Sequence, residues 1–340
     1  MRQAVMVSPG VIEFREVPEP RPGAGQVLIR VKRIGICGSD LHVNHGLHPF
    51  TSYPVVQGHE FSGVVEAVGE GVVGFRPGDK VTATPQIVCG TCRPCLRGDY
   101  HICDSLKVQG FQAPGCAQDL FVTSARQTLR LPDEFTFEQG AMVEPTAVAV
   151  HAVPRAGEVS GRNVVVLGAG PIGNLVAQVA RAGGAKVLVT DLSDFRLGVA
   201  RQCRLPHTSN AKHEQLAAAA ARVFGKDGFD IALECVGIEA TLSAAIDSIA
   251  KGGTIVVVGV FGEKPRIAMG LVQDRELMLI GTLMYRYQDY QRAVALMASG
   301  DVVTSPLEGE HFPFEQYSAA YQFIDEHREQ SVKVFVDVSS

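Results

Sequence analysis

The stretch VVVLGAGPIG, residues 164–173, decides the fold of this 340-residue chain. A short apolar run, typical of a buried strand, leads through a glycine-rich turn into the helix-like segment IGNLVAQVARAGG at 172–184. Gly168, Gly170 and Gly173 form the pattern G-x-G-x-x-G, which is weak evidence by itself. Because the pattern here follows a strand and opens a helix, it predicts the first βαβ unit of a dinucleotide-binding domain.

The segments that follow continue the same alternation of strands and helices. KVLVTD (186–191), FDIALECVG (229–237) and GTIVVVGV (253–260) are typical of short buried strands, and helix-like segments begin at Asp194 and Glu239. Short apolar strands that alternate with helices form parallel sheets that are covered on both faces. We therefore expect a doubly wound α/β domain in this part of the chain.

Asp191, at the end of the second predicted strand, favours NAD as the dinucleotide. It lies 18 residues after Gly173, where an acidic side chain accepts hydrogen bonds from the ribose hydroxyls and repels a 2′-phosphate. Arg196 lies five residues further on and can bind such a phosphate, so NADP stays an open alternative. The turn residues predicted to lie against the cofactor at the helix N-terminus are Gly168, Gly170, Pro171, Ile172 and Gly173.

The first 150 residues differ from this pattern, because their short strand-like segments are broken by glycine and proline. Examples are QAVMV, QVLIRVKRIGI, SGVVEAVG and DKVTATP, and the end of the chain, VKVFVDV, is strand-like again. The length of the chain suits two domains rather than one.

Composition argues against several classes of protein. The chain lacks a run of roughly 18 apolar residues, which a membrane-spanning helix needs. Its N-terminus lacks the pattern of a secretory signal, so we expect a cytoplasmic protein. The net charge is −5 and no block of like charge occurs, which favours neither a nucleic-acid partner nor a membrane surface.

Four of the eight cysteines lie in the segment CGTCRPCLRGDYHIC, residues 89–103, with the spacing C-x2-C-x2-C-x7-C. In a reducing compartment such clustering indicates metal binding rather than disulfides. Four thiolates suit tetrahedral zinc, and a fully protein-filled shell indicates a structural site. An iron–sulfur cluster is the alternative that the same residues allow. The predicted ligands are Cys89, Cys92, Cys95 and Cys103.

Three further motifs each carry a side chain of the kind that binds zinc. They are GICGSDLH with Cys37, GHEFSG with His59 and Glu60, and MVEPTAVAVHA with Glu144. Taken singly, each has an ordinary explanation as a packed core residue, a turn cap or an acid at a helix start. Taken together, a thiol, an imidazole and a carboxylate suit a catalytic zinc that keeps one position open.

In this order, the motifs resemble the zinc-dependent medium-chain dehydrogenases, and the resemblance covers the whole chain. It implies a GroES-like, β-rich catalytic domain made of residues 1–150 and 286–340. A Rossmann NAD-binding domain, residues 151–285, would be inserted between these two parts, which gives an α/β fold overall. The resemblance also implies two zinc ions per chain, a small-molecule substrate and a homodimer or homotetramer.

The resemblance assigns the zinc shell to single residues. Cys37 and His59 would bind the catalytic zinc, and Asp40 would hold the imidazole of His59 by its other nitrogen. Glu60 would act near the metal, either as a direct ligand, through water, or in some steps only. Glu144 stands where alcohol dehydrogenases have cysteine and where the polyol, threonine and butanediol branches have glutamate.

Other residues would handle the substrate and its proton. The resemblance implies that Ser39 contacts the substrate hydroxyl and that His42 passes the proton to solvent through the cofactor ribose. In GTLMYRYQDYQRA, residues 281–293, the pair Arg286 and Tyr287 resembles the RY pair of sorbitol dehydrogenases. An arginine there would bind neighbouring hydroxyls or a carboxylate. The alternative is that Arg286 pairs with an acidic residue between subunits or domains.

We therefore expect a zinc-dependent oxidoreductase that transfers a hydride from a secondary alcohol of a polyol or sugar acid to NAD. Activity as an L-threonine 3-dehydrogenase or a vicinal-diol (butanediol) dehydrogenase is the enzymatic alternative. A zinc-free quinone reductase-like protein or a non-enzymatic member of the scaffold is an alternative of another class. A zinc-bearing nucleic-acid module built on the four cysteines is disfavoured by the acidic balance of the chain.

Overall fold

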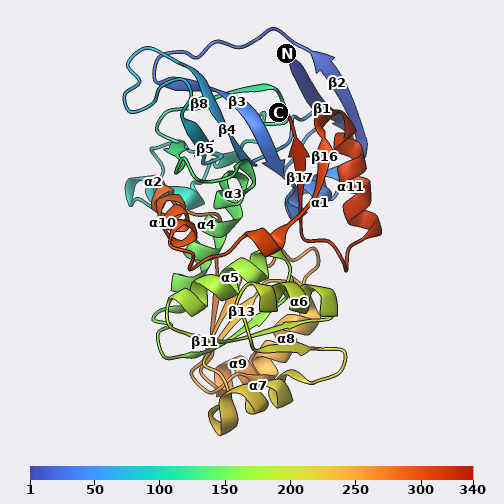
Figure 1. Ribbon diagram of the computed structural model, residues 1–340. Helices are drawn as coiled ribbons and strands as arrows, with labels where there is room; N and C mark the ends of the chain where they lie inside the picture. The colour runs from blue at the N-terminus through green and yellow to red at the C-terminus, as the bar shows by residue number, and fades with distance from the viewer. Residues whose placement is uncertain (340) are drawn as a thin grey trace. The chain divides into compact units, whose positions relative to one another are not determined.

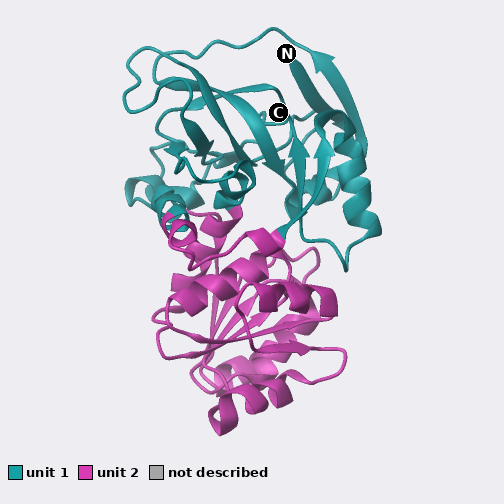
Figure 2. Ribbon diagram, viewed as in Figure 1, with its two compact units in different colours: residues 1–144, 286–294, 308–340 teal, residues 145–285, 295–307 magenta. Residues whose placement is uncertain are grey.

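The computed structural model describes residues 1–339, and the chain divides into two compact units (Figures 1 and 2). Unit 1 holds Met1–Glu144, Arg286–Val294 and the tail from Glu308 onward. Unit 2 holds Pro145–Tyr285 and Ala295–Leu307. Unit 1 is therefore assembled from three separate stretches of the chain, and the tail from Glu308 onward contributes residues to its core.

Unit 1 is built on a seven-stranded sheet. Its strands follow the order β16 (Glu308–Pro313), β17 (Lys333–Asp337), β3 (Gln26–Gly35), β4 (Glu60–Val68), β5 (Lys80–Ala83) and β9 (Thr128–Arg130), and β8 (Leu120–Ser124) also pairs with β3. The strand-like end of the chain, β17, pairs antiparallel with β3, with Phe335 opposite Gly35. The tail thus contributes two strands to the sheet.

Smaller elements complete unit 1. They are the hairpin β1 (Arg2–Ser8) and β2 (Val11–Glu16), the pair β6 (Gln86–Ile87) and β7 (Lys107–Val108), and the helices α1 (Gly38–Asn44), α2 (Arg93–Leu96), α3 (Phe137–Ala141) and α11 (Tyr317–Glu326). The core packs side chains of β3 against α11, including Ile29, Ile34, Tyr317 and Tyr321. Helix α4 (Val143–Ala152) carries the chain from unit 1 into unit 2.

Unit 2 is a six-stranded parallel sheet with helices on its faces. The strand order is β12 (Thr208–Asn210), β11 (Lys186–Asp191), β10 (Asn163–Leu167), β13 (Ile231–Glu234), β14 (Thr254–Val257) and β15 (Met278–Gly281). Its helices are α5 (Pro171–Ala182), α6 (Asp194–Gln202), α7 (Leu216–Phe224), α8 (Glu239–Ser248) and α9 (Met269–Asp274), and α10 (Tyr287–Ala298) follows in the chain.

This strand order is that of a doubly wound dinucleotide-binding sheet, in which the order reverses beside the first strand, β10. Every neighbouring pair is parallel, and the central strands are buried, as continuous apolar runs require. The α/β fold class predicted from the sequence is confirmed. The short strands β12 and β15 were not predicted.

The tested residues, 1–339, include no helix that is both long enough and apolar enough to cross a membrane.

Candidate functional site

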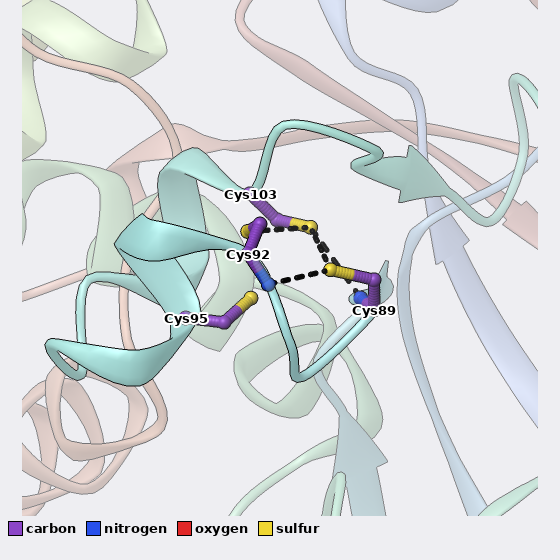
Figure 3. Close-up of side chains that lie close together, drawn as sticks. All are labelled: Cys89, Cys92, Cys95 and Cys103. Carbon is purple, nitrogen blue, oxygen red and sulfur yellow. Dashed lines mark hydrogen bonds between the residues drawn. The ribbon is translucent and has the colours of Figure 1, made fainter.

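The four cysteines of residues 89–103 converge on one point in unit 1 (Figure 3). Their sulfur atoms all lie within 4.8 Å of one another, and Sγ of Cys103 lies 3.5 Å from Cys89 and 3.8 Å from Cys92. In a tetrahedral site with Zn–S bonds of about 2.3 Å, sulfur atoms are about 3.8 Å apart. The thiols are free and already at the spacing that a zinc ion requires.

Backbone amides of the same loop point at these sulfurs. The N–H of Cys92 donates to Sγ of Cys89 at 3.3 Å, and the N–H groups of Cys89 and Ser105 donate to Sγ of Cys103 at 3.4 Å each. Amide hydrogen bonds from Thr91 and Cys92 lower the pKa of Cys89 to about 6, whereas desolvation and the neighbouring thiols raise the pKa of Cys95 to about 12. A divalent cation would stabilise all four thiolates at once, so the residues fit a structural zinc.

A second group of metal-binding side chains is buried where β3 and β4 meet. Ligand atoms of Cys37, His59 and Glu60 lie within 4.8 Å of one another. The antiparallel register places Gly35, the last residue of β3, opposite Glu60, the first of β4. Cys37 follows two residues later as the N-cap of α1, and His59 immediately precedes β4. The strand pairing therefore brings the thiol and the imidazole together.

Gly35 leaves room for the carboxylate of Glu60. A Cβ atom there would lie 2.5 Å from Oε2 of Glu60, which is far inside van der Waals contact. A side chain at this position would push the carboxylate of Glu60 out of the group.

Asp40 organises both Cys37 and His59. One carboxylate oxygen accepts the backbone N–H of Cys37 at 2.9 Å, and the other lies 3.4 Å from Nδ1 of His59. That Nδ1 is buried and makes no hydrogen bond of normal length within residues 1–339, so Asp40 is the acceptor it faces. With its proton on Nδ1, the imidazole presents Nε2 to a metal, as metal-binding histidines do.

The charge of the pocket also suits a cation. Burial lowers the pKa of His59, but the negative charges of Asp40 and Cys37 outweigh it and hold that pKa well above its ordinary value. The same negative charges would also attract a divalent metal. The residues Cys37, His59 and Glu60 therefore fit a catalytic zinc.

Lys333, which sequence reasoning missed, holds Glu60 in place. Its Nζ on β17 lies 2.6 and 2.8 Å from the two carboxylate oxygens of Glu60, and it donates to the carbonyl of Ile36 at 3.1 Å. Both side chains are at most 4% exposed. Burial lowers the pKa of Lys333, while Glu60 and Cys37 raise it above its ordinary value, so the pair is ionic. The one sequence signal was a lysine within the apolar strand VKVFVDV.

The remaining predicted residues of this centre lie around the group. Glu144 is buried at the start of α4, but among the described residues the set within 4.8 Å does not include it. Its charge contributes to the raised pKa of Lys333. Ser39 and His42 lie on α1, Ser39 half-buried and His42 exposed. Exposure leaves His42 in contact with solvent, where a proton can leave.

Arg286 contacts the cysteine segment. Its Nη2 lies 2.5 Å from Oδ1 of Asp99, and its Nε lies 3.4 Å from Nδ1 of His101. The backbone N–H of the next residue, Tyr287, donates to the hydroxyl oxygen of Tyr100 at 2.7 Å. The acid that pairs with Arg286 therefore lies within unit 1, directly after the cysteine loop of residues 89–98.

The glycine turn of unit 2 has the geometry of a phosphate cradle. Gly168 has φ of +99°, and a Cβ on Gly173 would lie 1.9 Å from the carbonyl oxygen of Gly168. A Cβ on Gly170, at the N-cap of α5, would meet no atom within 4 Å, so open space lies before the helix N-terminus. These features fit a pyrophosphate bound at the turn.

Asp191 is tied to this turn. One of its carboxylate oxygens accepts the N–H of Ala169 at 2.7 Å, and the other accepts the N–H of Ser193 at 2.8 Å. Arg196 lies in the first turn of α6, where its N–H donates to the Ser193 hydroxyl at 3.2 Å. The carboxylate is thus held at the end of β11, the position from which it can reach a ribose.

Comparisons with known proteins agree with both units. Residues 23–133 match the family model described as the alcohol dehydrogenase GroES-like domain, and residues 171–299 match that of zinc-binding dehydrogenase. A 2-dehydro-3-deoxy-L-galactonate 5-dehydrogenase of Pseudoalteromonas atlantica is 36% identical over 94% of this chain and 93% of its own length. A sorbitol dehydrogenase of Halalkalibacterium halodurans is 33% identical over 93% of each chain.

The fold is also similar to that of solved structures. A zinc-binding dehydrogenase from Sinorhizobium meliloti 1021, crystallised with NADP, superimposes with a TM-score of 0.90 at 29% identity, over 99% of both chains.

Proposed function

The chain belongs to the zinc-dependent medium-chain dehydrogenases, and on this premise we propose that it oxidises a secondary alcohol of a polyol or sugar acid with NAD. The observation that carries the proposal is the buried group of Cys37, His59 and Glu60, with the imidazole oriented by Asp40. A zinc-free quinone reductase-like protein or a non-enzymatic relative would have no use for such a group.

When bound, zinc supplies a Lewis acid that lowers the pKa of the substrate hydroxyl, and NAD accepts the hydride. In this chain Cys37 and His59 hold the metal, and Glu60 and Glu144 are the carboxylates available to complete its shell. Ser39 accepts the hydrogen bond of the substrate hydroxyl, and the exposed His42 takes the proton onward to solvent.

The cofactor binds through the glycine turn and Asp191. The turn residues Gly168, Gly170, Pro171, Ile172 and Gly173 contact the pyrophosphate. Asp191 accepts hydrogen bonds from the ribose hydroxyls, and its negative charge disfavours a 2′-phosphate although Arg196 is near. NAD is therefore the preferred cofactor.

The substrate class follows from the relatives and from Arg286. One relative is named for a sugar acid and another for a polyol, and both kinds of molecule carry neighbouring hydroxyls. Arg286 is 42% exposed, and a guanidinium has five N–H donors, so its pairing with Asp99 leaves donors for a substrate. Tyr287 lies beside it on the same segment.

The assembly and location are part of the same proposal. Strand β15 is the last in its sheet, and Met278 on it is 51% exposed, so we expect a second copy to bind at this edge in a homodimer or homotetramer.

All eight cysteines are free thiols, which suits the reducing cytoplasm.

The test is a substrate panel with zinc-loaded protein, followed by reduced-nicotinamide absorbance with NAD and, in parallel, NADP. The panel holds polyols, aldonic acids, vicinal diols and L-threonine. We expect the highest kcat/KM with a polyol or an aldonate and NAD. A preference for L-threonine or a vicinal diol would replace the proposed substrate class. A protein that binds two zinc ions and NAD but oxidises none of them would overturn it.

A further inference from the structure

Three buried polar side chains of unit 1 form a line that ends at His59. The hydroxyl of Tyr321, on α11, donates to Oε1 of Gln57 at 2.8 Å. Nε2 of Gln57 donates to the backbone carbonyl of Asp40 at 3.3 Å and lies 3.5 Å from its Oδ1. That same Oδ1 lies 3.4 Å from Nδ1 of His59. The line therefore runs from the C-terminal tail to a residue of the candidate metal centre.

All three side chains are buried, so a hydrogen bond lost here is not replaced by one to water. Asp40 is 0% exposed, Tyr321 1% and Gln57 3%. Water does not replace a lost partner at such a position, so each group depends on the next one for its hydrogen bond.

The direction of the line is set by the carboxylate of Asp40, which only accepts hydrogen bonds. A glutamine amide has an oxygen at one end and an N–H2 group at the other. Because the carboxylate needs a donor, the N–H2 end of Gln57 faces Asp40, and the amide oxygen at its other end accepts the hydrogen bond of the Tyr321 hydroxyl. Turned the other way, the amide oxygen would face that carboxylate, and the two negative atoms would repel each other.

Asp40 has a separate partner for its second oxygen. Oδ2 accepts the N–H of Cys37, which caps α1, so only Oδ1 is shared between Gln57 and His59. The position of Oδ1 then depends on what Gln57 donates to it, and the ring of His59 depends on the position of Oδ1.

We propose that Gln57 and Tyr321 are positioning residues for the metal bound by His59. They hold Asp40 so that it fixes the tautomer and the ring orientation of the histidine. The inference rests on the proposed function only in taking His59 as a metal ligand. It adds that the metal centre is complete only after the tail, which carries α11, has folded against the N-terminal stretch of unit 1.

The experiment uses full-length protein loaded with Co²⁺, whose absorption bands report the geometry of its ligands. The variants are Tyr321→Phe and Gln57→Leu, which keep the size of each side chain and remove its polar atoms. Tyr317→Phe is the matched control, since Tyr317 is equally buried on the same helix but its hydroxyl makes no hydrogen bond to Gln57 or Asp40. The Cys37→Ala protein identifies the bands of the four-cysteine site, which are subtracted.

Partners of metal-binding histidines change metal affinity or activity by about 10- to 100-fold when mutated. We expect both variants to release cobalt to excess chelator about tenfold faster, to shift the absorption bands and to lower kcat with the KM for NAD unchanged. Tyr317→Phe should behave as wild type.

The outcomes separate the two proposals. If Tyr321→Phe and Gln57→Leu keep wild-type bands and release rates, the positioning role is wrong, while the metal centre stands. If Cys37→Ala still binds two cobalt ions per chain, the metal centre itself is wrong. Should one variant fail to fold, the other tests the same line of contacts from its other end.

Discussion

The two metal centres of this protein differ in how their ligands are held. The four-cysteine loop lies within residues 89–103, and the backbone amides that donate to its sulfurs belong to residues 89–105. The centre of Cys37, His59 and Glu60 is buried and depends on side chains far away in the sequence. Lys333 holds Glu60 across 273 residues, and Tyr321 reaches Gln57 across 264.

The difference reflects what each centre has to do. A closed structural site needs four ligands and enough N–H donors to stabilise thiolates, and one loop can supply both. A catalytic site has to keep a position open, so its few ligands must be oriented by other groups. In this protein Asp40 and Gln57 orient His59, and the tail adds Tyr321 behind Gln57 and Lys333 beside Glu60.

The largest effect should come from removing a ligand of the buried centre. We expect Cys37→Ala to lower kcat/KM by at least about 10³-fold, because metal catalysis contributes several kcal/mol and each tenfold is about 1.4 kcal/mol. Zinc content should fall from two ions per chain to one, while NADH binding, measured by the fluorescence of its reduced nicotinamide, persists.

The control for that variant is Cys203→Ala, which removes a buried cysteine of unit 2 outside both metal groups. It should keep both zinc ions and full turnover. If Cys37→Ala retained activity, the centre of Cys37, His59 and Glu60 would not be the catalytic one.

A smaller but still large effect is expected for Lys333→Met. Removing one partner of a buried ion pair destabilises proteins by about 3–5 kcal/mol, because the other charge stays buried and uncompensated. Urea unfolding of the zinc-free protein measures this loss. With zinc present the loss should be smaller, since the metal offers Glu60 another cation.

A double-mutant cycle makes this prediction specific. In the Glu60→Gln background no uncompensated carboxylate is left behind. Lys333→Met should therefore lower the free energy of unfolding much less there than in the wild-type background. Equal losses in both backgrounds would mean that Lys333 stabilises the sheet by packing and does not hold Glu60.

The cysteine loop should give a local effect. In Cys95→Ser we expect one zinc per chain and rapid proteolysis within residues 89–103, because metal binding supplies the folding free energy of such a loop. The loss of kcat/KM should stay below about tenfold, or about 1.4 kcal/mol.

Leu96→Ala is the matched variant, since Leu96 lies in the same segment, is 75% exposed and leaves all four sulfurs and their hydrogen-bond donors in place. It should retain both zinc ions and resist the protease. A Cys95→Ser protein with as little activity as Cys37→Ala would show that the loop is not only structural.

The smallest effect on stability is expected at Arg286. Its pairing with Asp99 is partly exposed, and exposed ion pairs contribute about 0–1 kcal/mol, so Arg286→Met should leave the unfolding free energy nearly unchanged. If Arg286 also binds the substrate, the KM for the best polyol or aldonate should rise about tenfold through loss of charged hydrogen bonds.

Arg97 provides the comparison, because its Nη2 lies 3.0 Å from the other oxygen of the same carboxylate. Arg97→Met should leave KM unchanged. Equal KM values in both variants would restrict Arg286 to anchoring its segment on the cysteine loop.

Local patterns predicted much of this molecule. Three glycines at fixed spacing after an apolar strand, with Asp191 at the end of the next, predicted the parallel sheet of unit 2, which is confirmed. The cysteine spacing predicted that four thiols would converge, and they do. The short strand β12 escaped prediction because its three residues, TSN, include no apolar side chain, whereas β15, MLIG, escaped although it is apolar.

What the sequence by itself determined is therefore what neighbouring residues decide together: the strand–turn–helix at 164–182, the four-thiol loop and the types of side chain at Cys37, His59 and Glu60. Only the tertiary structure decided which distant groups hold these side chains. Lys333 and Tyr321 carry no spacing signal, because their partners lie more than 260 residues away. Such contacts are set by the pairing of β17 with β3 and by the packing of α11 against the core, where each buried charge or hydroxyl must find a partner.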